Sequence, residues 1–381
     1  MTWTKPDTPL RRGWTTGTCA AGASRAAFAA LIGGEFPDPV EVLLPGGQRP
    51  QFALAQAERG VDFARAAIVK DAGDDPDVTH GATIIATVRR GAPGAGVIFR
   101  AGAGVGVVTR PGLPLAPGEP AINPSPRAII RANLGEIAAH YGVAADVEVE
   151  ISIPDGERLA ARTMNGRLGV IGGLSILGTT GVVIPYSCSA WIDSIHRGID
   201  VARAAGLNHV AGATGATSEA GVQKLYGLSD QALIDMGDFV GGMIKYLRRR
   251  PVARVSIAAG FAKMTKLAQG LLDLHSRRGE VDLPALAARA QAAGASVGLA
   301  EKIGAANSAL HALELAQADG LDLPALIVGA AWPIAAAAFR GAPAALELVV
   351  FARDGALLAR SGFRDCAGIA RPAAGEGRVA D

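Results

Sequence analysis

Short apolar runs alternate with helical patterns between residues 187 and 268, and this alternation restricts the fold more than any other feature of the sequence. Residues 187–205 and 238–250 have helical patterns, whereas residues 208–213 and 252–259 are strand-like. Gly260 then opens a further helix with the sequence FAKMTKLAQG. Strands separated by helices pair in parallel. We therefore predict a C-terminal α/β part with parallel strands and a three-layer arrangement.

The N-terminal part mixes helix and strand patterns around glycine-rich loops. Residues 17–32 are rich in alanine and predict a helix capped by Thr16 or Thr18, and residues 126–141 predict a second helix. Residues 147–153 alternate apolar and acidic side chains, which predicts a half-exposed strand. The overall class is therefore α/β, with a mixed α+β N-terminal part.

Two domains follow from these patterns and from the length of 381 residues. We place a mixed α+β domain with glycine-rich and acidic loops at residues 1–170, and an α/β domain at residues 171–381. Near its end, residues 346–351 and 356–359 flank an Asp-Gly turn, which predicts a hairpin that returns to the sheet.

Charge and composition exclude several classes of function. Lysine and arginine total 37 against 35 acidic residues, so no basic field favours nucleic acid. Residues 168–192 carry no charge and are long enough to span a bilayer, but their glycines, Pro185 and hydroxyl residues favour buried strand and loop. The N-terminal residues lack an apolar signal segment, and three widely spaced cysteines form no CxxC pair. We expect a reduced, cytoplasmic protein without a metal site.

Four polar motifs that contain glycine are candidates for chemistry. The first, TTGTCAAGAS at residues 15–24, places Thr15, Thr16 and Thr18 at the start of a helix. Backbone N–H groups there can hold an anion or a carboxylate. A capped, tightly packed helix explains the same pattern, so both interpretations stay open.

The second motif, KDAGDDPDVTHG at residues 70–81, places Asp71, Asp74, Asp75 and Asp77 close together. Mutual repulsion and burial are expected to raise the pKa of at least one of them, which suits a proton acceptor or a cation site. The spacing is not that of an EF-hand. A solvated acidic turn is the alternative.

The third motif, AGAGVGVVTRPG at residues 101–112, contains Gly102, Gly104 and Gly106. Such glycines allow a ligand to approach the backbone closely. Because Val107 and Val108 follow, no helix starts there, and a dinucleotide fingerprint is rejected. A ligand-binding loop and a tight turn remain.

The fourth motif, NGRLGVIGGLSILGTTG at residues 165–181, offers Ser175, Thr179 and Thr180 as neutral donors. The alternative is a buried crossing between domains. Further along the chain, Lys263 and Lys266 lie one turn apart on a helix, where they can bind an anionic ligand or form a solvated face.

These motifs, in this order and together with GEPAINPSPR and GFAKMTKLAQG, resemble those of the CbiD family, the cobalt-precorrin-5B C(1)-methyltransferases of anaerobic cobalamin biosynthesis. The resemblance covers roughly residues 10–283. It implies methyl transfer from S-adenosylmethionine to carbon 1 of a cobalt-containing tetrapyrrole, giving cobalt-precorrin-6A and S-adenosylhomocysteine. Cobalt would belong to the substrate alone, and homo-oligomerisation is left open.

The resemblance also orders the candidate residues. We assign catalysis to Asp71, Asp74 and Asp75, and donor binding to Gly102, Gly104, Gly106, Thr109 and Asp77. Substrate binding is assigned to Thr15, Thr16, Thr18, Asn123, Arg127, Ser175, Thr179, Thr180, Lys263 and Lys266. Many members of the family carry a histidine where this chain has Phe261, so we interpret the helix with Lys263 as binding rather than catalysing.

Two other functions compete with the transferase. A tetrapyrrole carrier would hold the intermediate without methylating it. A small-molecule kinase would cradle phosphates on the glycine-rich loops, but the sequence has no P-loop lysine.

Overall fold

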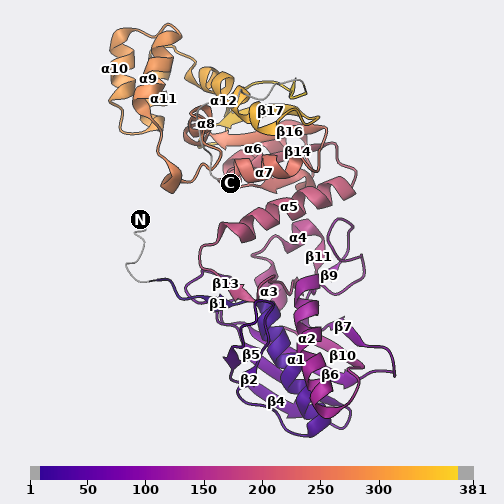
Figure 1. Ribbon diagram of the computed structural model, residues 1–381. Helices are drawn as coiled ribbons and strands as arrows, with labels where there is room; N and C mark the ends of the chain where they lie inside the picture. The colour runs from indigo at the N-terminus through magenta and orange to yellow at the C-terminus, as the bar shows by residue number, and fades with distance from the viewer. Residues whose placement is uncertain (1–8, 368–381) are drawn as a thin grey trace. The chain divides into compact units, whose positions relative to one another are not determined.

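The computed structural model describes residues 9–367 and divides the chain into two compact units, Met1–Cys188 and Ser189–Asp381 (Figure 1). The expected α/β class is confirmed. The division lies later than residue 170 because three short strands after that position pair with strands of the N-terminal unit. The pairs are β11 (Val170–Ile171) with β9 (Val107–Val108), β12 (Gly173–Leu174) with β8 (Gly104–Val105), and β13 (Val182–Val183) with β1 (Gly13–Trp14).

The N-terminal unit is built on a five-stranded sheet in the order β4-β5-β6-β10-β7. Only the β10–β7 pair within it is parallel. The strands are β4 (Gln56–Arg59), β5 (Phe63–Val69), β6 (Thr83–Arg90), β7 (Val97–Ala101) and β10 (Val147–Ser152). The predicted alternation of β10 is confirmed, since every second residue is buried.

Two helices, α1 (Thr16–Gly33) and α2 (Pro124–Tyr141), share a hydrophobic core with this sheet. The opposite face of the sheet carries ion pairs, such as Arg100 Nε with Glu148 Oε2 at 2.8 Å. The cap of α1 is Thr15, and neither Thr16 nor Thr18 caps it, because the helix begins one residue earlier than expected. Smaller elements complete the unit: β2 (Val40–Glu41), β3 (Gln51–Phe52), α3 (Gly156–Ala160) and α4 (Asn165–Leu168).

The C-terminal unit is built on a six-stranded sheet in the order β15-β14-β16-β17-β18, with β19 also paired to β17. The first four strands are parallel, and β18 and β19 run antiparallel to β17. The strands are β14 (His209–Ala213), β15 (Leu233–Asp235), β16 (Arg254–Gly260), β17 (Ala345–Phe351), β18 (Leu357–Arg360) and β19 (Arg364–Asp365).

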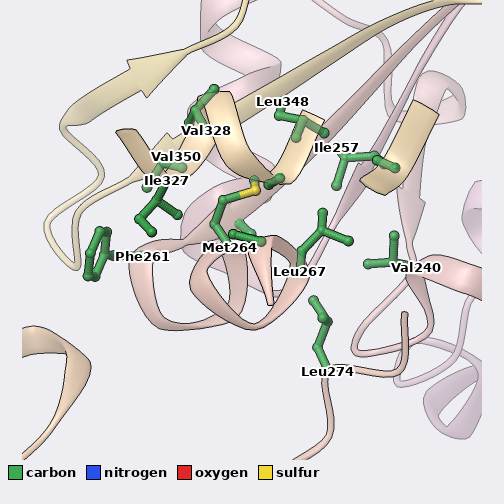
Figure 2. Close-up of a cluster of buried hydrophobic side chains, with 14 of the residues drawn as sticks. Val240, Ile257, Phe261, Met264, Leu267, Leu274, Ile327, Val328, Leu348 and Val350 are labelled. Atoms are coloured by element: carbon green, nitrogen blue, oxygen red, sulfur yellow. The ribbon is translucent and has the colours of Figure 1, made fainter. Parts of the chain in front are cut away.

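Helices cover both faces of this sheet. Figure 2 shows one face, where Ile257 and Leu348 pack with Met264 of α8 (Phe261–Ala268) and Ile327 of α12 (Leu323–Phe339). On the other face a separate cluster joins the next residues along each strand, including Ala258 and Val349, to Val222 of α6 (Ala216–Tyr226). The predicted three-layer arrangement therefore follows from strict alternation along the strands.

The remaining elements of the unit are α5 (Cys188–Ala204), η1 (Asp230–Ala232), α7 (Val240–Leu247), η2 (Ser276–Arg278), α9 (Leu283–Ala292), α10 (Val297–Gly304) and α11 (Ala309–Ala318). Helices α9 to α12 each begin at an aspartate or serine whose side chain accepts a backbone N–H, which is an ordinary N-cap. Among residues 9–367, no helix is long and apolar enough to cross a membrane.

Candidate functional site

The first and fourth motifs meet at the start of α1. Thr16 Oγ1 accepts a hydrogen bond from the N–H of Leu177 at 3.0 Å, and Thr18 Oγ1 donates to the carbonyl of Gly181 at 2.6 Å. Thr15 Oγ1 accepts from the N–H of Thr18, and the N–H of Gly17 donates to the carbonyl of Leu177. All three threonines are buried. The hydroxyl groups of Thr16 and Thr18, together with the backbone N–H of Thr15, which donates to the carbonyl of Gly181, therefore hold the segment 177–181.

The start of α2 holds the same segment from its other end. The N–H of Asn123 donates to the carbonyl of Ile176 at 3.0 Å, and the N–H of Ile176 donates to Ala121. The Arg127 side chain binds groups close to it in the sequence. Its Nε donates to the carbonyl of Ile122 at 2.7 Å, and its Nη2 lies 3.2 Å from Glu119 Oε2. Two helix starts thus fix one loop.

The outer side of this loop is uncharged and exposed. Thr179 and Thr180 are exposed, and the Leu177 side chain is 52% exposed. Ile184 and Tyr186, further along, are exposed to a similar degree. Ser175 is half-buried, with its Oγ 3.4 Å from Asn165 Oδ1. We call residues 175–186 the uncharged loop.

The aspartates of the second motif bind neighbouring chain segments. Asp71 forms an ion pair with Arg11 and accepts the N–H of Gly73. Asp74 accepts the N–H of Arg11 at 2.6 Å, and Asp75 accepts the N–H of Tyr186 at 2.7 Å. Hydrogen bonding from Arg11 and Gly73 lowers the pKa of Asp71 to about 2. The expected rise in pKa is therefore wrong for Asp71, because its partner is a cation.

Asp77 forms the most buried ion pair of this motif. Its Oδ2 lies 2.7 Å from Nζ of Lys70, whose side chain is only 1% exposed. Burial acts to raise the pKa of Asp77, but the Lys70 ammonium and hydrogen bonds from Lys70 and Thr79 outweigh it, so the pKa is lowered. Within residues 9–367, no group of three or more His, Cys, Asp or Glu side chains is arranged to hold a metal ion.

The glycines of the third motif lie where three backbone segments cross. A Cβ atom on Gly104 would overlap the carbonyl of Ile153, and one on Gly173 would overlap Gly104 itself. Gly104 also has a φ of +74°, which favours glycine. Gly102 and Gly106 are similarly tight, and Thr109 Oγ1 donates to Gly169 O at 2.8 Å. Packing within the chain is therefore sufficient to explain these residues.

Lys263 and Lys266 lie in the C-terminal unit and are engaged there. Lys263 Nζ donates to the carbonyl of Thr214 at 2.8 Å and lies 3.1 Å from Asp238 Oδ1. Lys266 Nζ donates to the carbonyl of Leu274 at 3.1 Å. The contacts of Lys263 tie the loops after β14 and β15 to helix α8, and that of Lys266 holds the segment that follows this helix.

Sequence reasoning missed the residues around the end of β15. Asp235 is the last residue of this strand, and the indole Nε1 of Trp191 donates to its carbonyl at 3.0 Å. Gly215 lies in the turn that follows β14. A strand of three residues is too short to show a periodicity. The signal that could have found it is an acidic residue about 20 positions after a glycine turn.

The chain matches two family models. Residues 3–185 match the model described as CbiD, and residues 273–362 match the CbiD C-terminal domain. A cobalt-precorrin-5B C(1)-methyltransferase of Agrobacterium fabrum is 63% identical over 92% of this chain and 93% of its own. One of Methylorubrum extorquens is also 63% identical, over 92% and 97%.

A crystal structure described as a cobalamin biosynthesis protein (cbiD) from Archaeoglobus fulgidus is also similar in sequence. It is 26% identical, and the match covers 82% of this chain and 85% of that one, with a TM-score of 0.38. A likeness at this score supports no argument about geometry.

Proposed function

Because this chain belongs to the CbiD family, we propose that it transfers a methyl group from S-adenosylmethionine to carbon 1 of cobalt-precorrin-5B. The observation that carries the proposal is the 63% identity, over nearly the full length of both chains, to relatives with that name. Cobalt enters as part of the substrate. The donor is the finer part of the proposal, since a methyltransferase needs one and the names do not state it.

The uncharged loop is our candidate for the surface that binds the macrocycle. A tetrapyrrole presents wide apolar faces, which suit the exposed Leu177, Ile184 and Tyr186 side chains. Thr179, Thr180 and Ser175 supply hydroxyl groups beside them. The buried Thr15, Thr16 and Thr18 then act as positioning residues that fix the loop.

Methyl transfer depends more on the orientation of the donor and the macrocycle than on a strong base. In methyl transfer the bond from sulfur to the methyl carbon breaks with its electrons going to sulfur, while the macrocycle carbon supplies the pair for the new carbon–carbon bond. Correct orientation of two reactants contributes about 7–11 kcal/mol. Asp71, with a pKa of about 2, is a weak proton acceptor at neutral pH. We assign Asp71, Asp74 and Asp75 to holding the chain segments of residues 11 and 186.

The direct test is anaerobic incubation of the protein with cobalt-precorrin-5B and S-adenosylmethionine, followed by mass spectrometry. The proposal expects one methyl group gained by the tetrapyrrole and one equivalent of S-adenosylhomocysteine. A folded protein that retains the tetrapyrrole without changing its mass would contradict it and support a carrier.

A second test concerns the uncharged loop. Leu177→Asp and Ile184→Asp place a charge where the apolar face of the macrocycle would lie, so KM for the tetrapyrrole should rise about tenfold or more. Val297→Asp, at an equally exposed apolar position of α10, is the matched control. Unchanged KM in both loop variants would remove this surface from the site.

A further inference from the structure

Three parallel strands of the C-terminal unit end at one edge of the sheet. Ala213, the last residue of β14, is paired with Asp235 of β15 on one side and Ala258 of β16 on the other. The chain leaves β14 toward β15 through α6, and then crosses back through α7 to β16 on the opposite side. Ligands of open α/β sheets bind at the carboxyl ends of the strands at such a reversal of strand order.

Two glycines at this edge have no role in packing. A Cβ atom on Gly215 or Gly260 would meet no atom of residues 9–367 within 4 Å. The backbone of Gly215 is extended, with φ of 164°, and Gly260 has φ of −74°, so neither conformation requires glycine. The chain therefore has room for a side chain at both turns. This room lets a ligand lie directly on the backbone at both turns.

A carboxylate and an aromatic ring stand at the same edge. Asp235 is half-buried and follows Leu233 by two residues, so its side chain lies on the face of the sheet that α6 covers. The Trp191 indole is 47% exposed and is fixed by its hydrogen bond to the Asp235 carbonyl and by contact with Gly237. An acidic residue at the end of the second strand hydrogen-bonds ribose hydroxyls in folds of this type.

Lys263 makes this edge rigid. By contacting both Thr214 and Asp238, its ammonium joins the turn after β14 to the turn after β15. Oδ1 of Asp238 is buried and has that ammonium as its neighbour, without an aligned hydrogen bond. The turns that would contact a ligand are thus held in place before it binds.

We propose that the adenosine part of the methyl donor binds at this edge, with its ribose on Asp235, its base against Trp191 and its backbone contacts at Gly215 and Gly260. This inference rests on the proposed function for the identity of the ligand. It assigns the donor to residues of the C-terminal unit instead of Gly102, Gly104, Gly106 and Thr109.

The test measures binding of S-adenosylhomocysteine to the full-length protein by titration calorimetry. Asp235→Asn and Gly215→Val should each raise Kd about tenfold or more. The first removes the charge of the group that accepts the ribose hydrogen bond, and the second fills the space that the ligand would occupy. Asp319→Asn, at the exposed residue that follows α11, and Gly298→Ala, at an exposed position of α10, should leave Kd unchanged. Unfolding midpoints equal to that of the parent protein show that each variant is folded.

The results distinguish failure of the proposed donor site from failure of the proposed function. Parent-like Kd in both edge variants overturns the inference, as does a loss of binding caused by Thr109→Val instead. Lost binding in the edge variants supports it even if the parent protein yields no methylated tetrapyrrole, in which case the proposed function fails alone. Methylation by the parent together with parent-like Kd in the variants leaves the function standing and rejects the site.

Discussion

The two glycine-rich turns of this protein look alike in sequence and differ in what surrounds them. In the N-terminal unit, a Cβ atom on Gly104 would overlap the backbone of Ile153, so the turn is filled by the chain itself. In the C-terminal unit, a Cβ atom on Gly215 would meet no atom of the described part of the chain within 4 Å. A glycine motif in a sequence therefore indicates that another group can lie close to the backbone. The sequence alone does not distinguish a group of the chain itself from a ligand.

The largest effect is expected at the filled turn. Gly104→Ala must both adopt a left-handed backbone and displace the Ile153 carbonyl, so we expect a loss of about 4 kcal/mol in the free energy of unfolding. Gly94→Ala is the matched control, with φ of +78° and open space, and should lose only about 1–2 kcal/mol. Urea unfolding of both variants measures the difference. Equal losses would mean that the crossing of segments at Gly104 does not restrict the turn.

The two units also differ in the partners of their buried ionisable side chains. In the N-terminal unit, buried Lys70 is paired with Asp77. Asp77→Asn leaves the buried Lys70 ammonium unpaired, so unfolding should become easier by about 3 kcal/mol. The folded pKa of Asp77 lies below its ordinary value of 3.8. The contribution of the pair is therefore complete above that value and is lost as the pH falls through the folded pKa.

Urea unfolding between about pH 2 and pH 7, a range that spans the ordinary pKa of this aspartate, measures the contribution of the pair. The loss of unfolding free energy in acid that we assign to Asp77 should be absent in Asp77→Asn. It should be present in Asp62→Asn, the control at an exposed position. Identical pH profiles for parent and Asp77→Asn would show that the pair adds no stability.

In the C-terminal unit the buried carboxylate of Glu347 accepts hydrogen bonds from hydroxyl groups, those of Tyr226 and Ser256. Tyr226 donates its hydroxyl to Oε2 of Glu347, whereas Oε1 of Glu347 has no hydrogen-bond partner among the residues that the structure describes. Tyr226→Phe should cost about 2 kcal/mol because it removes a partner from a buried acceptor, whereas the exposed Tyr141→Phe should be neutral. Burial and Glu347 also raise the pKa of Tyr226 to about 12, so its ultraviolet titration should occur above that of an ordinary tyrosine. A tyrosine that titrates normally at this position would contradict the contact.

The smallest effect concerns the exposed acidic motif. Arg11→Gln should raise the pKa of Asp71 from about 2 toward its ordinary value of 3.8, as followed by carboxyl NMR. Both side chains of the pair are exposed, so the free energy of unfolding should hardly change. An Asp71 titration that is unaffected by the substitution would show that Arg11 is not its partner in solution.

The sequence predicted those elements whose pattern is long enough to be read. The alternation of residues 147–153 anticipated β10, and the alternation of strand and helix anticipated the parallel β14 and β16. It did not reveal β15, which has three residues, or the burial of Lys70, because both depend on neighbours distant in the chain. For the same reason Thr16 and Thr18 were expected to contact a ligand, whereas their hydroxyl groups contact Leu177 and Gly181.

Hydrogen–deuterium exchange of the full-length protein, with and without S-adenosylhomocysteine, tests most directly which glycine turn takes the donor. If the donor binds at the edge of the C-terminal sheet, amide exchange should become slower on binding in peptides that cover residues 212–219 and 233–238. Exchange in residues 101–109 should not change. Slower exchange confined to residues 101–109 would contradict it and return the donor to the N-terminal unit.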